Sequence, residues 1–226
     1  MQYRSVTVLA PAKLNLSLDV VGTLPNGYHD LDMVMQTIDL YEKITLRRSH
    51  DLTLNLPGSF VPANDKNTAV KAALAFFAYT GLLAGVDMTI YKRVPVRAGM
   101  AGGSADAAAV LRTLRELVSP TLTDERLEQI NANVGSDVPF CIRGGTQLAE
   151  GRGEKLTVLK PAPRFFVAVC KPDFPISTPA LFARVDGVTI TDRPDTDAML
   201  AAIEHGDADK TIENFTKAVE RFSNMG

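Results

Sequence analysis

A glycine-rich stretch ahead of a long helical pattern is the strongest chemical signal in this sequence. Residues 95–109 read PVRAGMAGGSADAAA, with Gly99, Gly102 and Gly103 before the helix. Glycine lets backbone N–H groups approach an anion closely and adopts positive φ without strain. A helix N-terminus adds unpaired N–H donors and a partial positive charge. The stretch is typical of a phosphate cradle, in which the Ser104 hydroxyl would contact a phosphate oxygen or a bound Mg²⁺.

Glycine content alone leaves a second interpretation open, in which the turn only packs a strand against a helix. Two better-known phosphate motifs are excluded. A P-loop ends in Gly-Lys-Ser/Thr, and no lysine follows these glycines. The dinucleotide fingerprint G-x-G-x-x-G does not fit residues 99–103 either. Lys92 and Arg93, just before the loop, could steer ATP or could be a solvated strand end.

Several other polar residues are candidates for chemistry, each with a simpler alternative. Lys13 and Asn15 are two apart on an alternating stretch, so both would point to one polar face. Lys13 could hold a carboxylate or a phosphate, or be an ordinary solvated lysine. Asp137 lies in a turn before an apolar run and is either a turn-former or a held base. The pair Tyr28-His29 follows an Asn-Gly turn and could simply pack on the surface.

The elements that must position these residues follow from periodicity and turn signals. Alternation predicts strands over 14–20, over 52–56 and from Met88 onward. A helix is expected from about Thr68 to Tyr79, with Asn67 as its N-cap and Gly81 as its stop signal. Its apolar stripe would be Val70, Ala73, Leu74 and Phe77.

The second half of the chain carries further expected elements. A second helix begins near Gly103, with Ala107, Val110, Leu111, Leu114 and Val118 on one face. Residues 138–142 read as an apolar strand, 144–153 as a strand with a tight turn, and 165–170 as a buried strand. The last helix covers 209–222, with Ile212, Phe215, Val219 and Phe222 at helical spacing.

Composition narrows the class of protein. The chain has 226 residues, of which 46% are hydrophobic and 22% charged, as in ordinary globular proteins. Its net charge of -2 and lack of a basic stripe argue against nucleic acid as a partner. Cys141 and Cys170 are expected to be reduced, half-buried thiols. No apolar run approaches a membrane span and no signal peptide is seen, so we expect no membrane partner and a cytoplasmic location.

The motifs together resemble a known superfamily. The loop at 95–109 is similar to the P-x-x-x-G-L-G-S/G-S-S-x-A-A phosphate loop of the GHMP kinases. APAKLNLSLDV at 10–20, NGYHDL at 26–31 and GSDVPF at 135–140 resemble one of its families, the 4-diphosphocytidyl-2-C-methyl-D-erythritol kinases. These motifs follow the family's order over residues 10–182. Four ordered matches are far more specific than any one of them.

The resemblance implies roles for particular residues. Lys13 and Asp137 would be catalytic, with Asp137 as the general base and Lys13 orienting it and stabilising the phosphoryl group. Asn15, Tyr28, His29, Thr178 and Phe182 would bind the substrate, with Tyr28 and Phe182 stacking on its cytosine and His29 reading the base edge. ATP would contact Asn67, Pro95, Gly99, Met100, Ala101, Gly102, Gly103, Ser104 and Ala105. Asn67 could serve both as this contact and as the helix cap. Mg²⁺ would accompany ATP, and its ligands are left open.

The resemblance also implies a fold and a reaction. The fold would be α+β with two lobes: a ribosomal-protein-S5-domain-2-like kinase domain over 1–156 and a shortened ferredoxin-like domain over 157–226. The enzyme would phosphorylate the 2-hydroxyl of 4-diphosphocytidyl-2-C-methyl-D-erythritol with ATP, in the non-mevalonate route to isoprenoids, as a monomer or weak homodimer. The alternatives are another GHMP kinase with a different alcohol, and a non-catalytic nucleotide-binding protein.

Two departures from the family pattern are visible. The chain ends at residues 224–226 without the family's third motif, a glycine-serine-glycine turn, which leads us to expect a truncated or weakened kinase with an apolar face of its last helix uncovered. The loop also has Ser104-Ala105 where many relatives have two serines.

Overall fold

The computed structural model describes residues 5–131, 134–171, 183, 185–187 and 191–224. The chain forms two compact units that are interleaved along the sequence. Unit 1 comprises Met1–Lys13, Thr37–Val96 and Met100–Gly144, and unit 2 comprises Leu14–Gln36, Arg97–Gly99 and Gly145–Gly226. The division into domains at residue 156 stays a prediction. The mixed α+β class expected from the sequence is confirmed.

Two long strands, β1 (Ser5–Thr23) and β2 (His29–Ser49), contribute residues to both units and pair with each other. In unit 1, β2 pairs antiparallel with β4 (Gly85–Tyr91), and β4 pairs parallel with the short β3 (Thr53–Asn55). In unit 2, β2 pairs antiparallel with β5 (Thr146–Gly151), which forms a hairpin with β6 (Lys155–Val158).

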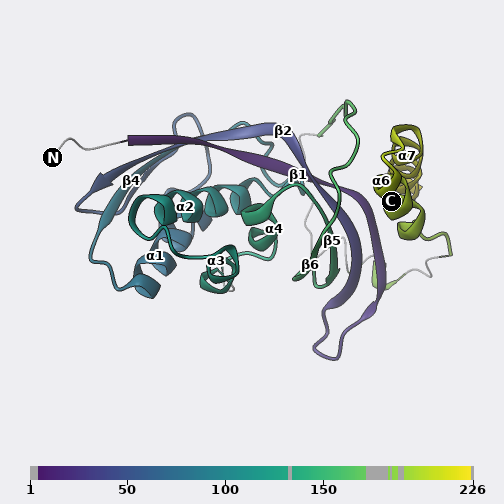
Figure 1. Cartoon of the computed structure of the whole chain (residues 1–226), viewed down its shortest axis with the longest axis horizontal. Coiled ribbons are helices and arrows are strands. Elements are labelled where there is room, and N and C mark those ends of the chain that lie inside the picture. Colours follow the sequence, from purple (N-terminus) through teal and green to yellow (C-terminus); the bar gives the residue numbers. More distant parts are fainter. Residues whose placement is uncertain (1–4, 132–133, 172–182, 184, 188–190, 225–226) are drawn as a thin grey trace. The chain divides into compact units, whose positions relative to one another are not determined.

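Unit 1 places its helices together against its strands (Figure 1). These are α1 (Thr68–Thr80), α2 (Gly102–Val118), α3 (Asp124–Ile130) and α4 (Val138–Arg143). The predicted ends of α1 are confirmed, because Asn67 caps its first turn and Gly81 ends it with a φ of 68°. Four of the nine buried residues of α2 are alanines, whose small side chains let neighbouring elements approach the helix closely.

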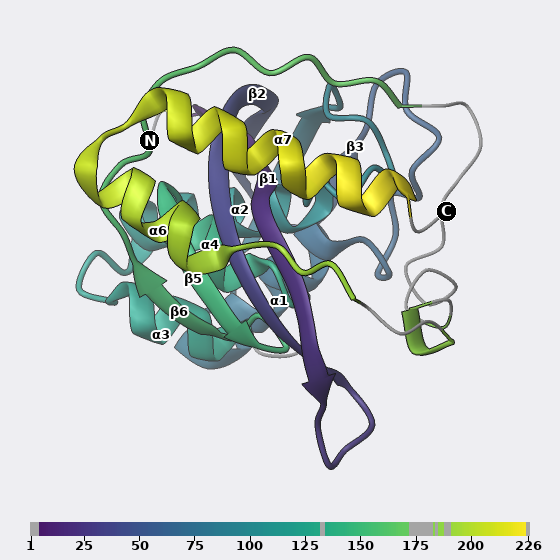
Figure 2. The ribbon, with the colours of Figure 1, turned by 90° about the vertical axis from the view of Figure 1, so that its right-hand side faces the viewer.

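Unit 2 contains α6 (Thr196–His205) and α7 (Ala208–Asn224), which are joined by a tight turn at Gly206 (Figure 2). Met199 and Ile203 of α6 pack with Leu16 of β1 and Val34 of β2 in a buried cluster. The helix predicted over 209–222 is confirmed as α7, whereas α6 was not anticipated.

Three strand predictions need correction. Residues 138–142 form the helix α4 instead of a strand, because a short apolar run is ambiguous and Pro139 is well tolerated in a first helical turn. Residues 165–170 form no regular element, and Cys170 is exposed instead of half-buried. The strand at 14–20 exists, but its polar side is also covered: Ser17 bonds to Thr196, and Asp19 pairs with Arg193.

The predicted apolar stripes are only partly correct. In α1, Leu74 is 49% exposed, while Ala69, Ala72 and Phe76 are buried. In α2, Val118 is 45% exposed. In α7, Thr211 and Ala218 are the buried residues among those whose side chains are described, Ile212 and Val219 are exposed, and the side chain of Phe222 lies outside that set. The remaining predicted members are mostly correct: Val70, Ala73, Ala107, Val110, Leu111 and Leu114 are buried, and Phe215 packs against the core of unit 2.

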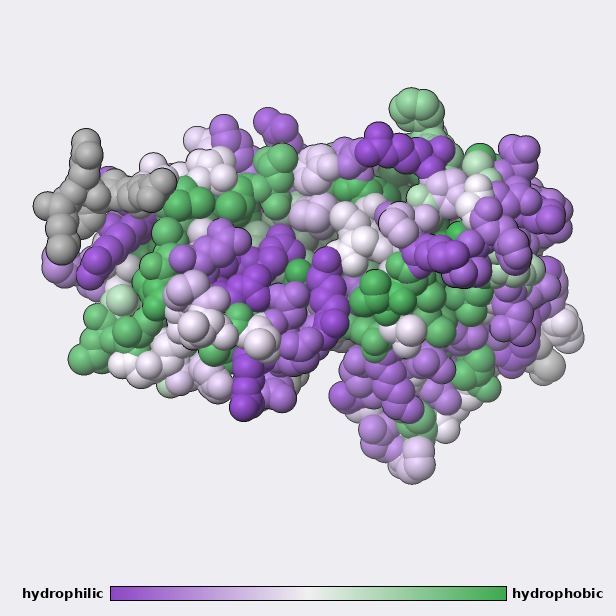
Figure 3. All heavy atoms as spheres, in the orientation of Figure 1, coloured by the Kyte–Doolittle hydropathy of each residue, from purple (hydrophilic) through white to green (hydrophobic). Residues whose placement is uncertain are grey.

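Hydrophobic residues on the face drawn in Figure 3 gather in separate areas between hydrophilic ones. None of the helices in the described ranges has the length and hydropathy that crossing a lipid bilayer would require.

Candidate functional site

The glycine-rich loop has an alternating backbone. Arg97, Gly99 and Ala101 have φ of 57°, 70° and 56°, whereas the residues between them do not have positive φ. Alternation of right- and left-handed residues turns successive N–H groups toward one concave side, the geometry known as an anion-binding nest. The loop ends where α2 begins, so the free N–H groups of the helix N-terminus follow the nest directly.

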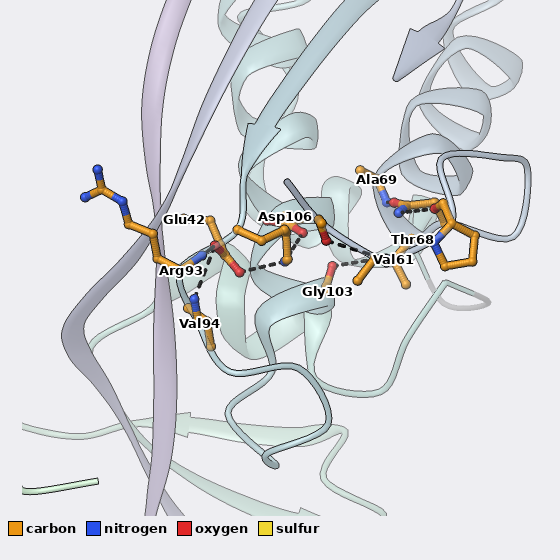
Figure 4. Close-up of polar contacts among 12 residues, drawn as sticks. Glu42, Val61, Thr68, Ala69, Arg93, Val94, Gly103 and Asp106 are labelled. Atoms are coloured by element: carbon orange, nitrogen blue, oxygen red, sulfur yellow. Dashed lines mark hydrogen bonds and ion pairs between the residues drawn. The ribbon is translucent and has the colours of Figure 1, made fainter. Parts of the chain in front are cut away.

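The glycines serve different purposes in this loop. Only Gly99 needs its positive φ, whereas Gly102 and Gly103 are helical. A Cβ on Gly103 would lie 3.1 Å from Thr68 Oγ1, whose hydroxyl donates to the Gly103 carbonyl over 2.7 Å (Figure 4). The expectation of positive φ is thus wrong for Gly102 and Gly103, which are needed for close packing.

Lys13 and Asp137 meet beside this loop, as the resemblance implied. Lys13 Nζ lies 3.8 Å from Asp137 Oδ2, and the Lys13 backbone N–H donates to the Met100 carbonyl over 3.1 Å. Lys13 is 5% exposed, so it is not the solvated lysine of the alternative interpretation. The Asp137 side chain keeps 34% of its surface exposed and remains accessible to a ligand.

Two further contacts fix the chain on either side of Asp137. It directly precedes α4, and Arg112 of α2 donates from Nη1 to the Cys141 and Ile142 carbonyls over 2.5 and 3.1 Å. A Cβ built on Gly135 would lie 3.3 Å from Ser104 Oγ. The turn that carries Asp137 therefore packs directly against the first turn of α2, which carries Ser104.

Asn67 is occupied as a helix cap. Its Oδ1 accepts from the Ala69 N–H and its Nδ2 donates to the Pro62 carbonyl, each over 2.9 Å. The cap predicted from the sequence is confirmed, and α1 begins next to α2 because Thr68 bonds to Gly103.

Unit 2 carries the described residues expected to bind substrate. Tyr28 is 57% exposed, and the Arg152 guanidinium lies 5.0 Å from its ring centroid. His29 Nε2 lies 2.8 Å from Asp186 Oδ1. Asn15 Nδ2 lies 3.9 Å from Met33 Sδ. Thr178 and Phe182 lie outside the described residues.

Arg152 and Asp186 were not anticipated. Arg152 stands in the turn Gly151-Arg152-Gly153, which the sequence indicated only as a turn, and no spacing rule links it to Tyr28 far along the chain. Long-range contacts of this kind are set by strand pairing, here of β2 with β5.

Lys92 belongs to a buried cluster that the sequence also did not reveal. Its Nζ lies 2.6 Å from both Glu42 Oε1 and Asp106 Oδ2. Burial raises the pKa of Asp106 to about 7, although the nearby Lys92 opposes this. Burial lowers the pKa of Lys92, but Asp106 and Glu42 raise it further, to above its ordinary value. The interpretation of Lys92 as a solvated strand end is wrong.

A nucleophilic thiol finds no support at this site. Burial raises the pKa of the Cys141 thiol to about 12, so it stays neutral and is a poor nucleophile. Within the part of the chain that the structure describes, no group of three or more His, Cys, Asp or Glu side chains could hold a metal ion by itself.

Comparison with known proteins links this geometry to one family. The family model described as the GHMP kinases N terminal domain matches residues 67–145, which include the loop and Asp137. A protein from Clostridium tetani (strain Massachusetts / E88), named 4-diphosphocytidyl-2-C-methyl-D-erythritol kinase, is 41% identical over 214 residues, covering 94% of this chain and 76% of that protein.

A second relative and a solved structure point to the same family. A protein of the same name from Brevibacillus brevis (strain 47 / JCM 6285 / NBRC 100599) is 44% identical over 218 residues, covering 95% of this chain and 74% of that protein. A crystal structure of 4-(cytidine 5'-diphospho)-2C-methyl-D-erythritol kinase superposes with a TM-score of 0.71 at 30% identity, covering 89% of this chain and 72% of that one. This chain thus spans about three-quarters of the length of these relatives.

Proposed function

Because this chain belongs to the 4-diphosphocytidyl-2-C-methyl-D-erythritol kinase family of the GHMP kinases, we propose that it transfers the γ-phosphoryl group of ATP to the 2-hydroxyl of 4-diphosphocytidyl-2-C-methyl-D-erythritol. The observation that carries the proposal is the Lys13–Asp137 pair, 3.8 Å apart, beside an anion-binding loop. Phosphoryl transfer depends mainly on positioning and electrostatics, and this arrangement supplies both.

In this proposal Asp137 is the general base. Its partly exposed carboxylate accepts the proton of the substrate hydroxyl as the oxygen attacks the γ-phosphorus. Lys13 fixes the direction of that carboxylate through the ion pair, and its ammonium provides positive charge for the transferring group. The bond from Lys13 N–H to the Met100 carbonyl links this lysine to the loop that would hold ATP.

The loop would hold the ATP phosphates with backbone N–H groups. Its alternating φ at Arg97, Gly99 and Ala101 and the free N-terminus of α2 support this role. Pro95, Met100, Gly102, Gly103 and Ala105 would contribute backbone to the same site, and Asn67 would lie at its edge as the cap of α1.

Mg²⁺ fits the donors that are present. Magnesium usually takes only one or two protein ligands and completes its shell with phosphates and water. The Ser104 hydroxyl, packed against the turn that carries Asp137, is such a donor. When bound, the ion would neutralise charge on the ATP phosphates.

Unit 2 would recognise the cytidine end of the substrate. The exposed Tyr28 ring offers a face for the cytosine, and stacking is a sound way to hold a planar base. His29, held by Asp186, would bond to the base edge, and Asn15 would contact the substrate. Thr178 and Phe182 remain proposed contacts on the strength of the resemblance.

The experiment that tests the proposal measures ADP release by the wild-type chain with a panel of alcohols. We expect turnover with 4-diphosphocytidyl-2-C-methyl-D-erythritol and none above background with mevalonate or homoserine. Faster turnover with either of the latter would assign a different GHMP kinase activity. ATP binding without ADP release on any alcohol would instead identify a nucleotide-binding protein.

A further inference from the structure

Three charged side chains are buried together in unit 1, apart from the Lys13–Asp137 pair. Figure 4 labels two of them, Glu42 and Asp106. Glu42 comes from β2, Lys92 from the segment after β4, and Asp106 from α2. Their side chains are 0%, 10% and 4% exposed. We call this set the loop triad.

The loop triad grips the chain on both sides of the phosphate loop. On the entering side, Glu42 Oε2 accepts from the backbone N–H groups of Arg93 and Val94, the latter over 3.3 Å. On the leaving side, Asp106 lies one turn into α2 and is held by Lys92 over 2.6 Å. The Glu42 carboxylate therefore fixes the start of segment 93–106, and the Lys92 ammonium fixes its end through Asp106. The same ammonium also pairs with Glu42, so the two ends are connected.

Packing tightens the same connection. A Cβ built on Gly102 would lie 3.3 Å from Glu42 Oε1 and 3.3 Å from Val94 Cγ1. The first residue of α2 thus rests directly on Glu42 and on the segment that enters the loop. A displacement of Glu42 would be transmitted to the N-terminus of the helix.

Stability alone does not account for the loop triad. Burying charges carries a large desolvation cost, and replacing a buried ion pair with apolar residues is often neutral or stabilising. Asp106 Oδ1 is buried with no hydrogen-bond partner among the described residues, which adds to that cost. Directional bonds to backbone N–H groups, by contrast, are something apolar side chains cannot provide.

We propose that Glu42, Lys92 and Asp106 are positioning residues that hold the phosphate loop in its anion-binding backbone conformation before ATP arrives. The inference rests on the proposed function, in which that loop binds the ATP phosphates. It requires that disturbing the loop triad weakens ATP binding selectively, because the residues expected to bind the other substrate lie in unit 2.

The test compares Glu42→Leu, which removes the acceptor for the two backbone N–H groups, with Glu42→Gln, which keeps a carbonyl oxygen for them. The matched control is Asp87→Leu, which removes an ion pair and a hydroxyl contact between strands of the same sheet, away from the loop. Calorimetry measures ATP affinity, and steady-state assays measure KM for ATP and for the cytidylyl alcohol separately.

We expect Glu42→Leu to weaken ATP binding about tenfold or more, since buried donors lose their partner, with less than about twofold change in KM for the alcohol. Glu42→Gln should recover most of the loss, and Asp87→Leu should leave both values unchanged. Amide exchange at Arg93 and Val94 should accelerate in Glu42→Leu only.

Equal increases in both KM values, or ATP affinity in Glu42→Leu no weaker than in Asp87→Leu, would overturn the inference. If Glu42→Leu does not fold, Asp106→Asn takes its place, and unchanged ATP affinity there would overturn it as well. Wild-type protein that binds no ATP would refute the proposed function and this inference together, whereas wild-type turnover with insensitive variants would refute the inference alone.

Discussion

Unit 1 contains two clusters of Lys and carboxylate side chains that differ in geometry and access. In the first, Lys13 and Asp137 are 3.8 Å apart and the Asp137 side chain is 34% exposed. In the loop triad, both contacts are 2.6 Å and every side chain is at most 10% exposed. The first arrangement leaves the carboxylate room to meet a ligand, and the second leaves none. The difference agrees with the two proposed roles, catalysis by Lys13 and Asp137 and positioning of the loop by the loop triad.

Removing the reactive carboxylate should produce the largest effect. Asp137→Asn should lower kcat by about 10²–10⁴-fold, because an amide cannot accept the proton of the substrate hydroxyl. The thermal midpoint and the ATP affinity should stay close to wild type, since the residue is partly exposed. Steady-state kinetics and calorimetry on the purified variant check both parts, and near-normal turnover would remove Asp137 from the mechanism.

Removing the shared cation of the loop triad should lower the stability of the fold in addition to the affinity for ATP. Lys92→Met leaves Glu42 and Asp106 buried without their partner, and such a change typically costs about 3–5 kcal/mol. The exposed Arg47–Asp87 pair on the same strands should contribute only about 0–1 kcal/mol when Arg47→Met breaks it. Urea unfolding of both variants gives the comparison, and similar losses would contradict the distinction between closed and exposed pairs.

Substrate recognition in unit 2 should respond independently of both clusters. Tyr28→Ala should weaken binding of the cytidylyl alcohol by about 1–3 kcal/mol, the usual value of one stacked ring. ATP affinity should not change. Calorimetry with each ligand is the measurement, and Tyr28→Phe is the control that keeps the ring. Equal weakening of both ligands would mean that Tyr28 only supports the fold.

The most gradual effect should appear on titration. Burial raises the pKa of Asp106 from 3.8 to about 7, so the folded chain holds a proton that the unfolded chain has lost between these values. The residue's stabilising contribution is thus complete below about pH 4 and is lost as pH rises through about 7, by at most about 1.4 kcal/mol per pH unit.

Asp106→Asn should remove this contribution. The groups that act on Asp106 are Lys92 and Glu42, and the neutral Cys141 thiol of α4 also senses its charge. The difference in free energy of unfolding between wild type and variant, measured from pH 4 to 8, should therefore change with pH and level off above 7. A difference that is constant over this range would contradict the raised pKa.

Local signals predicted much of the fold. The cap at Asn67, the stop at Gly81 and the start of α2 follow from neighbouring residues, and all three agree with the structure. The run at 138–142 did not, because five apolar residues fit a strand or a helix equally well. Burial of Ser17 and Asp19 also escaped prediction, since it depends on Thr196 and Arg193, far away in the sequence.

The candidate site was likewise predictable only in part. Glycine content drew attention to the loop but left its role open, and the resemblance implied both that role and the closeness of Lys13 to Asp137. The loop triad could not be anticipated, because its members come from β2, from the segment after β4 and from α2 and meet only through tertiary packing.

Ala101 affects how the phosphate loop keeps its backbone conformation. Its left-handed φ of 56° carries a strain of about 1 kcal/mol in a residue with a Cβ. Glycine would relieve this strain, but its greater freedom in the unfolded chain would cost about 0.5–1 kcal/mol. The two residues are therefore nearly equivalent in net stability. They differ in the origin of the loop conformation: alanine keeps its left-handed φ only because the surrounding structure imposes it, whereas glycine would adopt it without that support.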